Sequence, residues 1–138
     1  GAQSVLRRPI ALENVSQYQA TPEEMPLVEM FNELHQRCGA PIHLDLNNLL
    51  VNERWLGEKP EAFLDALTAE VAWAHVAGHQ NVAMPIDDHS AMPSAQCMRL
   101  LSYLSDDTAV ILEWDRERPA LRSLLPVLER PEAMRDAL

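Results

Sequence analysis

Hydrophobic residues gather in four short segments that are bounded by turn-forming or helix-breaking residues. A short apolar run of this kind, too short for an amphipathic helix, is typical of a buried strand. The pattern therefore predicts four strands, at residues 9–15, 41–50, 71–77 and 108–114.

The stretches between these strands have the apolar spacing of helices, and each opens with a start signal. Thr21 is a candidate N-cap followed by proline, Pro60 stands at a first helical position, and Ser94 is a second candidate cap. We expect irregular connections at residues 52–59 and 80–92, both after strands. The predicted helices span residues 21–39, 59–67, 94–104 and 119–128.

Strands and helices alternate along the whole chain, which predicts an α/β fold built from four consecutive βα units around a parallel sheet. Such units occur in doubly wound domains and in (β/α)8 barrels. The four glycines form no phosphate-binding loop, so no motif supports a nucleotide fold. In either architecture the functional groups belong in the loops after the strands.

Composition narrows the class of protein further. With 138 residues, 47% hydrophobic and 23% charged, the chain has the size and make-up of a single globular domain, here residues 1–138. Its net charge of -10 would repel nucleic acids and anionic membranes, so neither is an expected partner. Without a membrane-spanning run or a secretory signal, we expect a cytoplasmic location. Cys38 and Cys97 lack metal or redox spacing, and we interpret them as buried or incidental thiols.

Every predicted strand carries a carboxylate or an imidazole near its carboxyl end, and the loop after the third strand adds more. In a parallel barrel these ends share one rim. An unpaired acid in an apolar strand is costly to bury, whereas a multiply charged cation stabilises several acids together. Oxygen and nitrogen ligands without thiolates favour iron or manganese over a structural zinc site. The residues concerned are Glu13, Asp45, His75, His79, Asp87, His89 and Glu113.

Each of these residues also has a structural interpretation. Glu13 and Glu113 could pair with an arginine at the end of the sheet, and Asp45 could form an Asx turn with the asparagines that follow it. His79 could be purely structural. His43, which shares a strand face with Asp45, could lie in the barrel interior or support the ligands. Only the set as a whole favours a metal site.

Six ordered motifs resemble the C-terminal half of the MbnB/TglH-like family of multinuclear non-haem iron TIM-barrel enzymes, over about residues 5–130. The motifs are Leu-Glu-Asn-Val-Ser-Gln-Tyr, Leu-Asp-Leu-Asn-Asn, Phe-Leu-Asp-Ala-Leu, His-Val-Ala-Gly-His, Ile-Asp-Asp-His and Ile-Leu-Glu-Trp-Asp. The resemblance implies two or three iron ions, with manganese or zinc as alternatives, and an oxidase that modifies cysteine in ribosomally made precursor peptides. It also implies a partner protein that presents the peptide.

Carried over to this sequence, the resemblance implies metal ligation by Glu13, Asp45, His75, Asp87, His89 and Glu113. Supporting or additional ligands would be Asn14, Asn47 and His79. We add His43 to this group because it lies on the same strand face as Asp45. The resemblance assigns no catalytic residue.

The family's N-terminal half has no counterpart in this sequence, and four βα units cannot close an eight-stranded barrel. We therefore expect either a fragment or a homodimer that completes a barrel-like core. Two other functions remain open: a non-catalytic half-barrel assembly module, and an isomerase-type or hydrolytic barrel that uses another divalent ion.

Overall fold

The computed structural model describes residues 2–20, 25–116 and 122–123 of the chain. Its regular elements, in chain order, are α1 (Ala2–Leu6), β1 (Leu12–Glu13), α2 (Leu27–Cys38), β2 (Ile42–Asp45), α3 (Leu46–Leu56), α4 (Pro60–Ala66), β3 (Val71–Val76), α5 (Ala95–Leu100), the 3-10 helix η1 (Leu101–Tyr103) and β4 (Ala109–Leu112).

The four strands form one parallel sheet in the order β1-β2-β3-β4. Right-handed connections between consecutive neighbours place the crossover helices on one side of the sheet. A doubly wound sheet requires a reversal of strand order, which this sheet lacks among the described strands. The prediction of an α/β fold is confirmed, and the unit is half of a TIM-barrel-like architecture.

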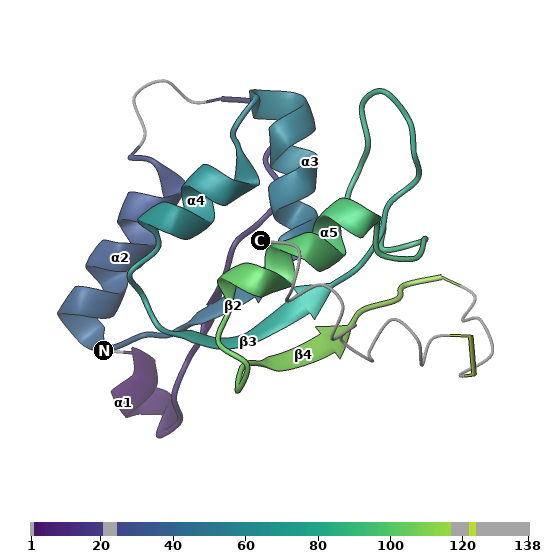
Figure 1. Ribbon diagram of the computed structural model, residues 1–138. Coiled ribbons are helices and arrows are strands. Elements are labelled where there is room, and N and C mark those ends of the chain that lie inside the picture. Colours follow the sequence, from purple (N-terminus) through teal and green to yellow (C-terminus); the bar gives the residue numbers. More distant parts are fainter. Residues whose placement is uncertain (1, 21–24, 117–121, 124–138) are drawn as a thin grey trace.

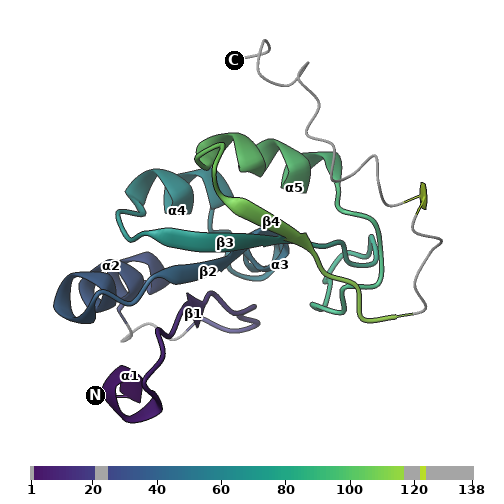
Figure 2. The ribbon, with the colours of Figure 1, turned by 90° about the horizontal axis from the view of Figure 1, so that it is seen from below.

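Helices α2, α3, α4 and α5 lie on one side of the sheet, and α1 lies apart from this layer (Figure 1). Seen from below, β1 and β4 are the two outer strands, with β2 and β3 between them (Figure 2). Among the described residues, no helix has the length and apolar character needed to cross a bilayer.

The core lies between the sheet and its helix layer. Ile42 and Leu44 of β2, and Ala74 and Val76 of β3, point into it and are at most 1% exposed. Phe31 of α2 packs into the same cluster. Because side chains alternate along a strand, the intervening residues of β2 and β3 face the other way, onto the open face of the sheet.

The predicted strand at residues 41–50 is wrong in its second half, because α3 begins directly after Asp45. The Asp45 carboxylate accepts a hydrogen bond from the backbone N–H of Asn48 and so caps α3, and Gly57 ends the helix in a left-handed conformation. Residues 46–52 are all buried. A helix that is buried on every side lacks amphipathic periodicity, so the apolar start of α3 resembled a strand. The end of α3, from residue 52 to residue 56, was wrongly expected to be part of an irregular connection.

The first strand and the first long helix also differ from prediction. β1 contains only Leu12 and Glu13 rather than residues 9–15. Helix α2 begins after Pro26, whose missing N–H suits a helix start, whereas the predicted start at residues 21–24 lies outside the described residues. The predicted end of α2 is confirmed, since Gly39 caps this helix in a left-handed conformation with φ of 65°.

The remaining start signals are confirmed. Pro60 stands in the first turn of α4, and the Ser94 hydroxyl accepts a hydrogen bond from the N–H of Cys97 at the start of α5. β3 matches its predicted range to within a residue, and β4 ends just before Glu113. The helix predicted at residues 119–128 lies outside the described residues, apart from 122–123.

Candidate metal centre

Polar side chains gather on the open face of the sheet, close to the carboxyl ends of the strands. Asp45 of β2 lies in register with His75 of β3, and Glu13 of β1 lies in register with His43. Each member of a four-residue group offers one ligand atom within 4.8 Å of the others; the members are Glu13, Asp45, His75 and Glu113.

Asp45 is fully buried and uses its two carboxylate oxygens differently. Oδ1 accepts the N–H of Asn48 at 2.8 Å, whereas Oδ2 is buried without a hydrogen-bond partner among the described residues. The ring nitrogens of His75 and His89 lie 3.9 Å and 3.8 Å from Oδ2, too far for hydrogen bonds. The free oxygen is therefore held where a cation could bind it.

Burial raises the pKa of Asp45 to about 7, and the nearby carboxylates of Asp87 and Glu113 act in the same direction. The hydrogen bond from Asn48 and the proximity of His89 oppose this rise. A carboxyl group with such a pKa is stabilised in its ionised form when a cation binds.

Asn14, also fully buried, fixes the backbone of Asp45. Its side-chain oxygen accepts the N–H of Asp45 at 2.7 Å, and its side-chain nitrogen donates to the Asp45 carbonyl at 2.8 Å. The carbonyl of Asn14 in turn accepts from the side chain of Asn48. This arrangement continues the β1–β2 pairing beyond the strand and orients Asp45.

Glu113 lies between two histidines. Its Oε2 atom is 2.7 Å from Nδ1 of His75 and 3.3 Å from Nδ1 of His89. The N–H of Glu113 donates to the carbonyl of Val76, which continues the β3–β4 pairing and sets the position of the side chain. Glu113 thus joins the strand residues to the loop that follows β3.

Asp87 and His89 meet within this loop, with 2.6 Å between Oδ1 and Nε2. Neither ring nitrogen of His89 has a hydrogen bond of acceptable geometry, although both are buried. The two side chains are thus close together without a hydrogen bond between them.

The backbone of His89 is left-handed, with φ of 38°, which is uncommon for a residue other than glycine. Burial lowers the pKa of His89, but the carboxylates of Asp87, Asp45 and Glu113 outweigh burial and raise it. Strain and concentrated negative charge at one buried imidazole are typical of a functional site.

A backbone bridge closes the base of this loop. The N–H of Ala91 donates to the carbonyl of Gly78 at 3.1 Å. A Cβ atom at Gly78 would lie 2.1 Å from the carbonyl oxygen of Met92, so only glycine fits this close approach. The bridge brings both ends of the loop next to the carboxyl end of β3.

Two aromatic residues hold the tip of the loop. The indole N–H of Trp55 donates to the carbonyl of Pro85 at 2.7 Å, and the hydroxyl of Tyr18 accepts the N–H of Asp87 at 3.0 Å. The two rings contact each other edge to face, with 5.4 Å between their centroids. Segments after β1 and within α3 therefore determine where Asp87 lies.

Asn47 connects His79 to Asp87. Its side-chain nitrogen donates to Asp87 at 2.9 Å, so its oxygen accepts from Nδ1 of His79 at 2.7 Å. This assignment leaves Nε2 of His79 with its lone pair. Burial lowers the pKa of His79 and favours the neutral ring, the form that binds metal.

His43 lies deeper on the open face, against the ring of His75, with 3.9 Å between the ring centroids. Its Nδ1 is 3.8 Å from Oε2 of Glu13, and its Nε2 is buried without a partner among the described residues. Burial lowers the pKa of His43, and the neighbouring His75 lowers it further.

Sequence reasoning missed Asp115. Its Oδ2 lies 3.3 Å from Nδ1 of His89, and its N–H donates to the His89 carbonyl. With His89 and Glu113 it forms a further group of ligand atoms within 4.8 Å of one another. The signal was its spacing of two residues from Glu113, which places both side chains on one face of an extended chain.

All six predicted metal ligands lie around one region at the rim of the sheet, and their binding of a metal stays a prediction. In the described part of the chain, the carboxylates of Glu13 and Glu113 lie within 4 Å of histidine ring nitrogens, and neither pairs with an arginine. The structural interpretation of Asp45, an Asx turn with the asparagines that follow it, is partly correct. One carboxylate oxygen accepts the N–H of Asn48, whereas the other has no hydrogen-bond partner among the described residues.

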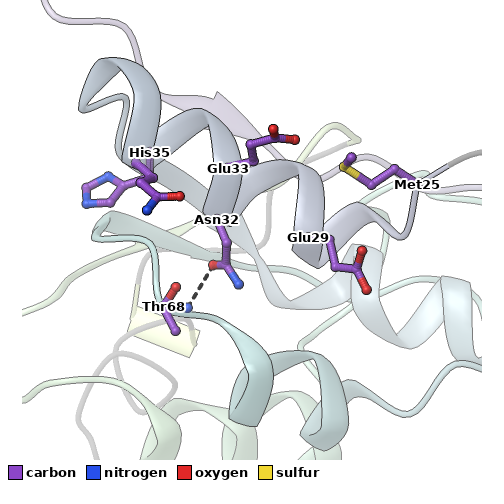
Figure 3. A pocket seen from close by; sticks show the side chains of 7 residues that line it. Met25, Glu29, Asn32, Glu33, His35 and Thr68 are labelled. Carbon is purple, nitrogen blue, oxygen red and sulfur yellow. Dashed lines mark hydrogen bonds between the residues drawn. The ribbon is translucent and has the colours of Figure 1, made fainter.

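Two surface cavities of the described residues differ in whether they border this cluster. One, of about 580 Å³, lies along α2 and includes Asn32, whose side chain accepts the N–H of Thr68, and it contains no cluster residue (Figure 3). The other, of about 510 Å³, is lined by Asn47 and His79 and so borders the cluster. Of these two cavities, only the second lies beside the cluster.

Fold and site together define a parallel α/β half-barrel with a carboxylate and histidine centre at its rim. The family model described as "RiPP precursor modification enzyme MbnB/TglH/ChrH" matches residues 1–136. The chain belongs to this family.

Similar proteins include a UPF0276 protein of Shewanella loihica, 33% identical over 93% of this chain and 48% of the relative. A UPF0276 protein of Pseudomonas aeruginosa is 31% identical over 93% of this chain and 47% of its own length. One from Neisseria meningitidis is 37% identical over 83% of this chain and 44% of its own length. The chain spans about half the length of the curated relatives it matches.

Proposed function

We propose that this chain supplies the metal-binding rim of an iron-dependent oxidase that modifies cysteine in a ribosomally made precursor peptide. Family membership supports the reaction class. The observation that carries the proposal is the convergence of buried ligand atoms that make no hydrogen bond among the described residues, namely Oδ2 of Asp45 and the two ring nitrogens of His89.

The donor set fits iron. Carboxylate oxygens and imidazole nitrogens surround the site, and the described cysteines take no part, since Cys38 is on the surface and Cys97 lies in the core. Burial raises the pKa of Cys97 to about 12, so its thiol does not ionise readily.

The residues divide into two sets that meet at Glu113. Glu13, Asp45 and His75 come from the strands, whereas Asp87 and His89 come from the loop after β3. Oε2 of Glu113 lies within 3.3 Å of a histidine of each set, so Glu113 would hold metal together with residues of both sets. Bound iron would supply redox chemistry and a Lewis-acid site for a cysteine thiolate.

The cavity beside the cluster provides a route for the peptide. Its walls combine Asn47 and His79, which contact the cluster, with Arg54, Gln80 and Asn81, which offer polar groups at the surface. Asn47 orients Asp87, His79 in turn is hydrogen-bonded to Asn47, and both residues line this cavity.

Anaerobic loading with Fe²⁺ tests the proposal. After removal of free metal, we expect stoichiometric iron, and on oxidation a thiolate-to-iron absorption band when a peptide with one cysteine is added. The same peptide with serine in place of cysteine should give no band. The double variant Asp87→Asn, His89→Gln should bind less iron than the original chain, because the strand residues remain, whereas the control Asp65→Asn, His35→Gln should bind as much as the original chain. Absence of stoichiometric iron, or an equal response to both peptides, would contradict the proposal.

A further inference from the structure

Glu13, His43 and His75 form a second group of ligand atoms on the open face of the sheet, each within 4.8 Å of the others. The group draws one residue from each of three adjacent strands, β1, β2 and β3. His43 precedes Asp45 by two residues on the same face of β2, which places it about 7 Å farther from the rim. The group therefore extends the metal centre into the sheet.

Neither nitrogen of His43 is used by a hydrogen bond among the described residues. Nε2 is fully buried and unpartnered, and Nδ1 lies 3.8 Å from Oε2 of Glu13, beyond hydrogen-bonding distance. The side chain is only 15% exposed, so water does not readily replace the missing partners. Such a ring is expensive to bury unless something else binds it.

Packing holds the ring in this place. His43 contacts His75 edge to face and lies 5.4 Å, centroid to centroid, from the tilted ring of Trp73. Glu13 is directly opposite His43 in the β1–β2 register. Two imidazoles and one carboxylate, held on neighbouring strands with open positions, are the donor set that non-haem Fe²⁺ sites use.

We propose that Glu13, His43 and His75 bind a divalent metal, with His43 as a direct ligand rather than a supporting residue. This inference rests on the proposed function, because it shares Glu13 and His75 with the rim cluster. The two carboxylate oxygens of Glu13 let it serve both this position and the rim.

The test uses the unmodified chain, labelled with ¹⁵N in its histidines and titrated with Zn²⁺ as a diamagnetic probe. We expect one ring nitrogen of His43 to shift on metal binding, together with nitrogens of His75 and His89. His35, which lies in α2 next to the carbonyl of Ala40, should not shift.

The outcomes separate the two proposals. If His75 and His89 respond and the nitrogens of His43 keep their metal-free shifts, this inference is overturned and the rim cluster stands. If none of the three responds, the proposed function fails as well. The variant His43→Leu should also bind Zn²⁺ at this position about tenfold more weakly or worse. Unchanged affinity in a folded His43→Leu chain contradicts His43 as a ligand, and His35→Gln is the matched control.

Discussion

The side-chain amide of Asn14 makes two hydrogen bonds with the main chain of Asp45, one to its N–H at 2.7 Å and one to its carbonyl at 2.8 Å. These two hydrogen bonds take the place of the backbone hydrogen bonds that a further residue of β1 would make with β2. Asp45 is fixed where β2 ends and α3 begins, with one carboxylate oxygen capping the helix and the other lying near His75 and His89 without a hydrogen bond. Asn14, which directly follows the short edge strand β1, thus positions Asp45 at the end of the neighbouring strand β2.

Replacement of Asn14 by alanine should therefore weaken metal binding about 10- to 100-fold, because Asp45 loses the partner that orients it. The measurement is Zn²⁺ affinity by calorimetry. Asn32→Ala is the matched control, since Asn32 also bonds main-chain atoms, at Ala66, Thr68 and Ala69, but far from the cluster. Both variants should unfold more easily, and equal metal affinities in the two would refute the role of Asn14.

The metal-free chain should become less stable as the pH rises from about 4 to about 7. Burial raises the pKa of Asp45 from 3.8 in the unfolded chain to about 7 in the fold, so the folded state binds more protons across this range. A difference of this size corresponds to about 4 kcal/mol of unfolding free energy. The raised pKa of His89 acts in the same direction above pH 6.5.

Urea denaturation in the presence of a chelator, repeated at several pH values, measures this slope. The variant Asp45→Asn keeps an oxygen that can cap α3 but cannot ionise, so its profile should be flatter and its stability at pH 8 higher. The exposed Asp65→Asn variant should behave as the original chain does. Parallel profiles for the original chain and Asp45→Asn would show that Asp45 has an ordinary pKa.

Gly78→Ala should destabilise the fold by about 1–3 kcal/mol, because its new methyl group collides with the carbonyl of Met92. The loop that carries Asp87 and His89 would then move, so metal affinity should fall as well. Gly57→Ala is the informative comparison. Gly57 has open space around it but a φ of 74°, so its substitution costs stability without changing metal affinity. Retention of full metal affinity in a folded Gly78→Ala chain would contradict the positioning role.

Local signals predicted much of the fold. Gly39, Pro60 and Ser94 act at the helix ends where the sequence placed them, because caps and breakers work through neighbouring backbone groups. Helix α3 was missed because its first seven residues are buried on all sides and show no polar face. The alternation of elements was enough for the architecture, since sequential strand order follows from four similar βα units.

The gathering of the candidate ligands was predictable for a related reason, as the carboxyl ends of parallel strands meet at one edge. The contacts that other residues make with the loop after β3 were not predictable from the sequence. Asp115, Tyr18 and Trp55 contact the loop after β3 only because of the path that this loop takes. That path depends on the Gly78–Ala91 bridge, a pairing between residues that no local pattern links.

The central claim is that carboxylates and imidazoles from the strands and the loop after β3 share bound metal. X-ray absorption spectroscopy on the Zn²⁺-loaded chain tests it most directly, because it reports the atoms bound to the ion. We predict a first shell of oxygen and nitrogen at about 2.0–2.2 Å, with the outer scattering of imidazole rings and without sulfur. That imidazole scattering should decrease in His89→Gln. A shell of water oxygens alone, or a shell that contains sulfur, would contradict the account.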